Sequence, residues 1–150
     1  MAIEAPLSKY KKNNTLIIAA ILIGVGAWFA YDGYKNPDFI KKHTVDGVAD
    51  STLNFNRKAP PFMIGAGILL GIYFVVIKDK KIVADENELI AGSTTVSYDS
   101  IEKINKTHFD KKGFFIVTYS HSGQNKELKL SDRTYDNLGA VLDQIVSKIS

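Results

Sequence analysis

The sequence contains no cysteine, and this absence excludes several kinds of site at once. Without thiols, the chain has no disulfide, no thiolate nucleophile and no cysteine-ligated zinc or iron–sulfur cluster. Disulfides therefore give no information about the compartment in which the protein resides. Localisation has to be inferred from hydrophobic segments and from the charges that flank them.

Two long stretches lack every charged side chain. Residues Thr15–Tyr31 read TLIIAAILIGVGAWFAY, and residues Ala59–Ile77 read APPFMIGAGILLGIYFVVI. About 20 apolar residues in a helix span the hydrocarbon core of a bilayer, so both stretches are predicted to be transmembrane helices that form a hairpin. Two buried helices of a soluble protein are the alternative, but a chain of 150 residues is too short to cover two such helices on every side. The lack of charge within the spans argues against an ion path or a transport site.

The residues around these stretches fit the same interpretation. Pro60 and Pro61 are expected in the first turn of the second helix, where a missing N–H costs nothing. Trp28 and Tyr31 lie where interfacial aromatic rings are expected. The lysines before the first stretch also fit a cleaved signal peptide, but that apolar run is longer than a usual signal core, and no clear cleavage site follows it.

The hairpin divides the chain into five segments. They are a basic N-terminal tail (1–14), the first transmembrane helix (15–31), a connecting loop (32–58), the second transmembrane helix (59–77) and a water-soluble domain (80–150). In the loop, His43, Asp46 and Asp50 could be imagined as metal ligands. A single histidine in a loop that also carries lysines is more simply solvated, so no metal site is predicted.

Small residues recur at spacings of four within both apolar stretches. Ala20 and Gly24 form one such step, and Gly67 and Gly71 form another. In lipid, helices associate through close packing, which small residues permit. These helix-packing residues are expected either to pack the hairpin against itself, which is the favoured interpretation, or to dock a partner helix.

After Lys81 the pattern changes to short alternating segments separated by turn residues. These segments predict strands at 82–84, 88–91, 94–98, 101–107, 114–119 and 127–130. Apolar residues then recur at spacings of three and four from Tyr135 to Ile149, which predicts one amphipathic helix capped by Ser131 or Asp132. The predicted fold is a membrane α-helical hairpin plus a small α+β domain, an antiparallel meander with a C-terminal helix.

The C-terminal half resembles the bacterial pleckstrin-homology-like (PH-like) domains that are attached to membrane hairpins. The resemblance covers roughly Lys80 to Ser150 and includes the polar-Tyr-x-x-Ile step Tyr98-Asp99-Ser100-Ile101. It implies an antiparallel PH-like meander or barrel, capped by the C-terminal helix. The whole chain also resembles a family of small, uncharacterised bacterial membrane proteins with a Tyr-Asp-Gly motif after the first helix, here Tyr31-Asp32-Gly33.

Recognisable catalytic chemistry is sparse. There is no P-loop, dinucleotide fingerprint, nucleophile elbow or zinc-protease motif. His108 and Asp110 flank a turn and His121 lies in another, and each reads more simply as solvated turn chemistry. We therefore expect a protein that is not an enzyme, uses no cofactor and has no small-molecule substrate. The formal charge of +3 is too small and too scattered to predict nucleic-acid binding.

Several lysines are candidates for contact with lipid headgroups, since basic residues near an anionic leaflet are attracted to it. They are Lys78, Lys80, Lys81, Lys103, Lys106, Lys111 and Lys112. The simpler interpretation is a solvated face plus a cluster that stops the second helix. Specific inositide binding is not expected, because the first hairpin of the domain, Asp85–Glu88, is acidic rather than basic.

The expected function is that of a membrane-anchored interaction module that binds a protein partner or a second copy of itself. An anionic-lipid surface sensor and an accessory subunit of a larger membrane complex are the alternatives. Two spans place both termini on one side, and the resemblance implies the cytoplasmic side of the bacterial inner membrane. Flanking basic residues favour this side only slightly, by six against five: Lys9, Lys11, Lys12, Lys78, Lys80 and Lys81 against Lys35, Lys41, Lys42, Arg57 and Lys58.

Overall fold

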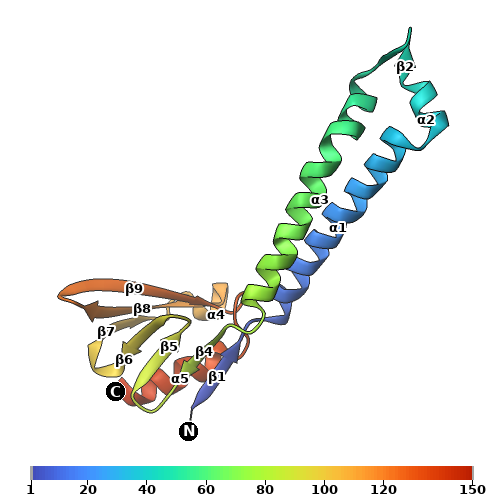
Figure 1. Cartoon of the computed structure of the whole chain (residues 1–150). Helices are drawn as coiled ribbons and strands as arrows, with labels where there is room; N and C mark the ends of the chain where they lie inside the picture. Colours follow the sequence, from blue (N-terminus) through green and yellow to red (C-terminus); the bar gives the residue numbers. More distant parts are fainter. Residues whose placement is uncertain (1, 150) are drawn as a thin grey trace. The chain divides into compact units, whose positions relative to one another are not determined.

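The computed structural model describes residues 2–149, and the chain divides into two compact units (Figure 1). The helical unit comprises residues 13–76, and the sheet unit comprises the described residues of segments 1–12 and 77–150. The sheet unit is therefore built from both ends of the chain. Two apolar helices, antiparallel sheets and a C-terminal helix confirm the α+β fold expected from the sequence.

The sheet unit contains two antiparallel sheets within residues 2–149. One has the strand order β1-β4-β5-β6 and the other has the order β7-β8-β9, and the two sheets do not close into a barrel over these residues. All six predicted strands are present, with bounds close to those expected. The elements are β1 (Ile3–Pro6), β4 (Lys81–Ala84), β5 (Glu88–Ala91), β6 (Thr94–Ser97), the 3-10 turn η1 (Tyr98–Ser100), β7 (Ile101–Asn105), α4 (Phe109–Lys112), β8 (Phe114–His121), β9 (Gln124–Ser131) and α5 (Leu138–Ile149).

Strand β1 is absent from the sequence analysis, which assigned residues 1–14 to a basic tail. It pairs antiparallel with β4 in a register that places Ile3 opposite Ala84 and Pro6 opposite Lys81. Ala5 is fully buried in the core. Pro6 can stand here because β1 is the edge strand of its sheet, where one side of the backbone needs no ladder partner.

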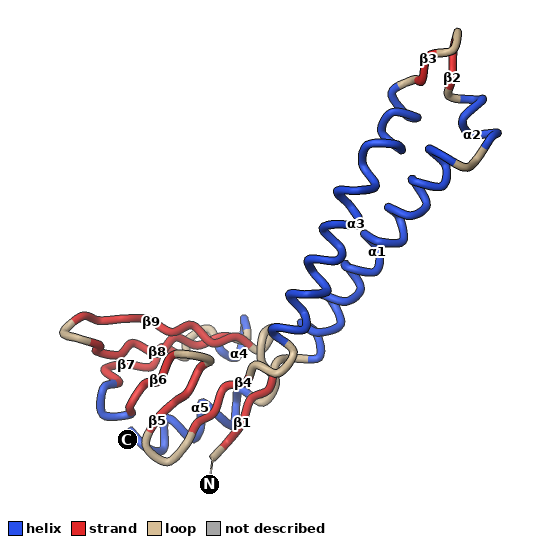
Figure 2. The backbone as a smooth tube through the Cα atoms, in the orientation of Figure 1, coloured by secondary structure: helices blue, strands red, loops and turns tan. Residues whose placement is uncertain are grey.

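Helix α5 closes the core of the sheet unit and packs against β1 and β4 (Figure 2). Its apolar side, including Val141 and Ile145, meets core residues of both sheets, such as Leu89 and Phe115. The predicted cap at Ser131 or Asp132 is wrong, because α5 begins at Leu138. The intervening residues instead bind the N-terminal segment: Tyr135 bridges Leu7, and the Asn137 side chain donates to the Glu4 carbonyl oxygen over 3.0 Å.

In the helical unit, α1 and α3 run side by side and are joined by a short helix and a two-stranded turn (Figure 1). The elements are α1 (Lys9–Tyr34), which begins within the sheet unit, α2 (Pro37–Lys42), β2 (Thr44–Val45), β3 (Val48–Ala49) and α3 (Ser51–Ile77). Both long helices are long and apolar enough to cross a membrane. Apolar side chains cover their outer faces; Phe62, for example, is 79% exposed. Such faces suit lipid better than water.

The prolines of α3 lie inside the helix rather than in its first turn, so that prediction is wrong. The helix begins at Ser51 because the Asp50 side chain accepts the Leu53 amide over 2.8 Å and caps the amino end. Pro60 and Pro61 therefore leave the carbonyls of residues 56 and 57 without their usual amide donors.

Residues at the end of α1 meet these two carbonyls. The Tyr34 hydroxyl donates to the Arg57 carbonyl oxygen over 3.0 Å. Gly33 lies so close to the Asn56 carbonyl that an added Cβ would stand 2.8 Å from its oxygen, which only glycine avoids. In return, the Arg57 Nε donates to the Gly33 carbonyl oxygen over 2.9 Å. The close approach of α3 to Gly33 therefore explains why a glycine ends the Tyr-Asp-Gly motif.

Two glycines in turns of the sheet unit provide a matched test of local packing. Gly113 and Gly123 both have positive φ, at 67° and 76°. An alanine Cβ at Gly113 would overlap the Asp132 carboxylate, whereas at Gly123 it would meet nothing within 4 Å. We expect Gly123→Ala to lower the free energy of unfolding by about 1 kcal/mol and Gly113→Ala to lower it by about 2–4 kcal/mol.

Urea unfolding of the chain in mild detergent, followed by the circular dichroism of the strands, measures both free energies. Equal losses for the two variants would contradict the close approach of Asp132 to Gly113.

Candidate functional site

The lysines expected to contact lipid headgroups do not form one cluster. Lys78 and Lys80 lie between α3 and β4, and the Lys81 Nζ is 2.5 Å from the Glu4 Oε1. Lys103 is on β7, Lys106 follows that strand, and Lys111 and Lys112 end α4. Of these candidates, Lys112 lines a hollow on the sheet unit.

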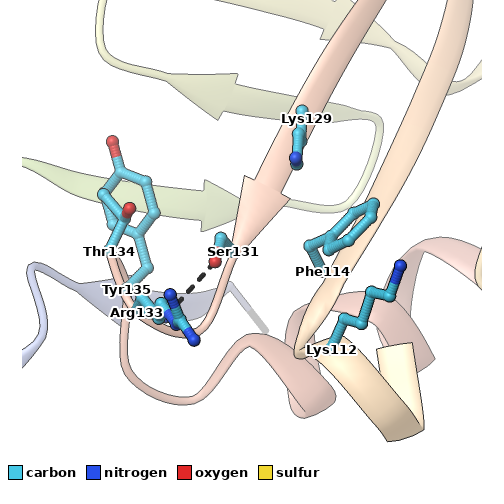
Figure 3. Close-up of a pocket in the computed structure, with 7 residues that line it drawn as sticks. All are labelled: Lys112, Phe114, Lys129, Ser131, Arg133, Thr134 and Tyr135. Atoms are coloured by element: carbon cyan, nitrogen blue, oxygen red, sulfur yellow. Dashed lines mark hydrogen bonds between the residues drawn. The ribbon is translucent and has the colours of Figure 1, made fainter. Parts of the chain in front are cut away.

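This cationic hollow has a volume of about 640 Å³ (Figure 3). It is open to solvent and lies in the sheet unit, where the start of β8, the end of β9 and the connection from β9 to α5 meet. Three of its lining residues are cationic and none is acidic. The lining residues are Lys112, Phe114, Lys129, Ser131, Arg133, Thr134 and Tyr135.

The alternation of β9 explains how this strand contributes to the hollow. Leu130 is buried in the core, so Lys129 and Ser131 lie on the opposite face of the strand. Ser131 stands directly opposite Phe114 in the β8–β9 register. The Lys129 Nζ lies 4.0 Å from the centre of the Phe114 ring, a distance at which a cation is attracted to the face of the ring.

The wall formed by Arg133, Thr134 and Tyr135 is held by Ser8, which is 1% exposed. The Ser8 hydroxyl donates to the Arg133 carbonyl oxygen over 2.7 Å, and the Ser8 amide donates to the Thr134 carbonyl oxygen over 2.8 Å. The same hydroxyl accepts the Lys11 amide over 3.1 Å and so caps the start of α1. One buried serine therefore fixes both the hollow and the first turn of a long apolar helix.

Lys129 and Arg133 were missed by the sequence analysis. The available signal was their spacing, because Lys129, Ser131 and Arg133 recur at intervals of two and would share one face of an extended segment. The predicted strand ends at Leu130, and the predicted helix follows with its cap at Ser131 or Asp132. That assignment separated Arg133 from Lys129.

Tyr98, the aromatic residue of the Tyr-x-x-Ile step, has a structural role. Its hydroxyl donates to the Asp85 carbonyl oxygen over 2.8 Å, and its amide donates to the Asn87 carbonyl oxygen over 3.0 Å. Burial raises the pKa of the Tyr98 phenol, with a further contribution from the charges of Asp85 and Glu88. A neutral phenol is what this hydrogen bond requires, so the residue holds the turn between β4 and β5.

The three loop residues considered as metal ligands have other contacts or positions. The His43 Nδ1 lies 2.7 Å from the Asp50 Oδ2, while Asp46 occupies the β2–β3 turn with φ of 50°. The hydrogen bond from the Leu53 amide, and secondarily the contact with His43, lower the pKa of the Asp50 carboxyl. The stabilisation from this cap is therefore fully present above the ordinary pKa of an aspartate and is lost as the pH falls through the lowered pKa. Among residues 2–149, no group of three or more candidate ligands could hold a metal ion.

The four small residues of the apolar helices separate into two kinds. At Gly67, an added Cβ would stand 2.6 Å from the Ile23 Cγ1 and 3.0 Å from the Ala19 carbonyl oxygen, so this glycine packs the hairpin against itself. Gly24 and Gly71 have nothing within 4 Å of an added Cβ. Ala20 is exposed, whereas its neighbour Ala19 is buried.

This difference predicts opposite results for two similar substitutions. Gly67→Leu should separate α1 from α3 and destabilise the hairpin by about 1–3 kcal/mol, because its side chain would overlap the backbone of α1. Gly71→Leu should leave the stability of the hairpin unchanged. The fluorescence of Trp28, the only tryptophan of the chain, reports unfolding as SDS is added to mild micelles. Equal losses of stability in the Gly67→Leu and Gly71→Leu variants would show that the packing face has been misassigned.

Comparison of the chain with protein-family models, curated proteins and solved structures found no match.

Proposed function

We propose that the chain is a membrane-anchored, non-enzymatic interaction module whose PH-like domain binds a protein partner at the membrane surface. The anchor would be the hairpin of α1 and α3, two helices of sufficient length and apolar character. Sheets of four and three strands within residues 2–149, followed by α5, support a PH-like assignment for the domain. The step at Tyr98 lies between β6 of one sheet and β7 of the other.

The free edge of β9 is the observation that carries the proposal. This strand pairs with β8 along its full length, from Gln124 to Ser131, and ends its sheet within the described residues. An extended segment of a partner can add to such an edge through main-chain hydrogen bonds. Lys126 and Lys129 on the strand disfavour indiscriminate pairing, and they leave an acidic or polar partner strand as the better match.

An accessory role in a larger membrane complex is a second candidate, because Gly24 and Gly71 remain open on α1 and α3. Small residues on an uncovered face would let a partner helix approach closely in lipid. In this case the Gly71→Leu variant would release the complex although the hairpin itself stays folded.

Site-specific photo-crosslinking of the full chain in its native membrane tests the proposed edge. A crosslinking residue at Glu127, exposed on β9, should give an adduct of defined mass, whereas one at Asp143, exposed on α5, should not. Adducts of equal yield from both positions, or none from Glu127, would contradict binding at the edge of β9.

Topology is tested by thiol labelling, for which the cysteine-free chain is suited. We propose that both termini lie in the cytoplasm and that the segment from Asp32 to Lys58 lies outside. An impermeant reagent applied to intact cells should then modify Ser51→Cys and spare Ser122→Cys. Labelling of Ser122→Cys alone would invert the topology, and equal labelling of both would refute the hairpin.

A further inference from the structure

The cationic hollow is the feature of the sheet unit that protein binding at the β9 edge leaves unexplained. Its three cationic side chains, Lys112, Lys129 and Arg133, are absent from the ion pairs found among residues 2–149. The hollow is therefore a concave surface lined by three cationic side chains and no acidic one. The Asp132 carboxylate lies nearby, beside Gly113, and the cations outnumber it. Such a surface attracts anions, since clefts lined by one sign of charge concentrate the field.

We propose that the cationic hollow binds the phosphate group of an anionic phospholipid, an inference that rests on the membrane anchoring proposed above. Guanidinium groups bind phosphate oxygens through paired hydrogen bonds, and lysines add charge without fixed geometry. The hydroxyls of Ser131 and Thr134 line the same hollow and can donate to remaining oxygens. A volume of about 640 Å³ is larger than a free phosphate needs and leaves room for the glycerol ester.

The position of the hollow in the sheet unit favours a lipid over a soluble phosphate compound. Its wall at Arg133 and Thr134 is hydrogen-bonded to Ser8, which caps α1. The preceding Leu7 amide donates to the Lys80 carbonyl oxygen over 2.9 Å, three residues after α3 ends. Within the sheet unit, the wall of the hollow is thus linked through hydrogen bonds to the segments that immediately precede α1 and follow α3 in the chain. Headgroup phosphates lie at the ends of membrane-spanning helices.

The three cations can be neutralised without removing the contacts that hold the wall. Ser8 binds main-chain oxygens of Arg133 and Thr134, not their side chains. Lys112, Lys129 and Arg133 are themselves exposed. The triple glutamine variant should therefore keep the fold, which urea unfolding of the detergent-solubilised chain checks.

Native mass spectrometry of the full chain in mild detergent measures retained lipid directly. The probes are phosphatidylglycerol and phosphatidylcholine, which share a phosphodiester but differ in net charge. Wild type should retain phosphatidylglycerol at least about tenfold more strongly, and Lys112→Gln/Lys129→Gln/Arg133→Gln should abolish this preference. A control variant removes three exposed lysines outside the hollow and should keep the preference: Lys103→Gln/Lys106→Gln/Lys126→Gln.

Four further results decide the assignment. Arg133→Lys should weaken retention several-fold, since the charge remains but the paired hydrogen bonds are lost. An equal loss of preference in the two triple variants, or no loss in either, would overturn the site. Soluble glycerol phosphate should fail to displace the lipid; displacement at equal concentration would assign the hollow to a soluble ligand. If thiol labelling supports the hairpin but wild type shows no preference for phosphatidylglycerol, lipid binding by the hollow is overturned and the proposed membrane anchor is not.

Discussion

The pairing of β1 with β4 is the constraint on which the rest of the sheet unit depends. Residues 3–6 precede both long helices and residues 81–84 follow them, so the two ends of the hairpin are joined within one sheet. Ser8 and Leu7 extend this junction to the connection before α5 and to Lys80. The helical unit and the sheet unit are therefore not two modules in series along the chain, because residues 13–76 are inserted between two paired strands of the sheet unit.

A second constraint lies in the helical unit, where two prolines stand inside the apolar helix α3 and leave two of its carbonyls without their usual donors. Unpaired carbonyls are costly in lipid, where water cannot satisfy them. The Tyr34 hydroxyl reaches one of the two carbonyls, and the absence of a side chain at Gly33 permits the close approach of the other. The polar contacts between α1 and α3 thus gather near the turn end of the hairpin, while Gly67 and Gly26 allow close packing further along it.

The sequence predicted elements whose pattern is local and missed those that depend on distant partners. Alternation along residues 114–119 was sufficient to place β8, and charge-free runs placed both long helices. Strand β1 has four residues, one of them Pro6, and its pairing with β4 cannot be read from its own pattern. Tyr135 fits the helical spacing, yet it bridges Leu7 and lies outside α5. The cationic hollow combines residues 112–114 with 129–135, so only Lys112 had been considered.

Because both long helices lie between β1 and β4 in the chain, the order in which the protein can fold during synthesis is constrained. Strand β1 leaves the ribosome before its partner β4, which follows only after both apolar helices have been made. Closing so long a loop is slow and costs chain entropy unless something holds the ends together. Insertion of the two helices as a hairpin would supply this restraint, by bringing residues 8 and 77 to the same surface. The domain would then complete its first sheet only on chains whose hairpin had been inserted, so a failed insertion would leave β1 unpaired and open to degradation.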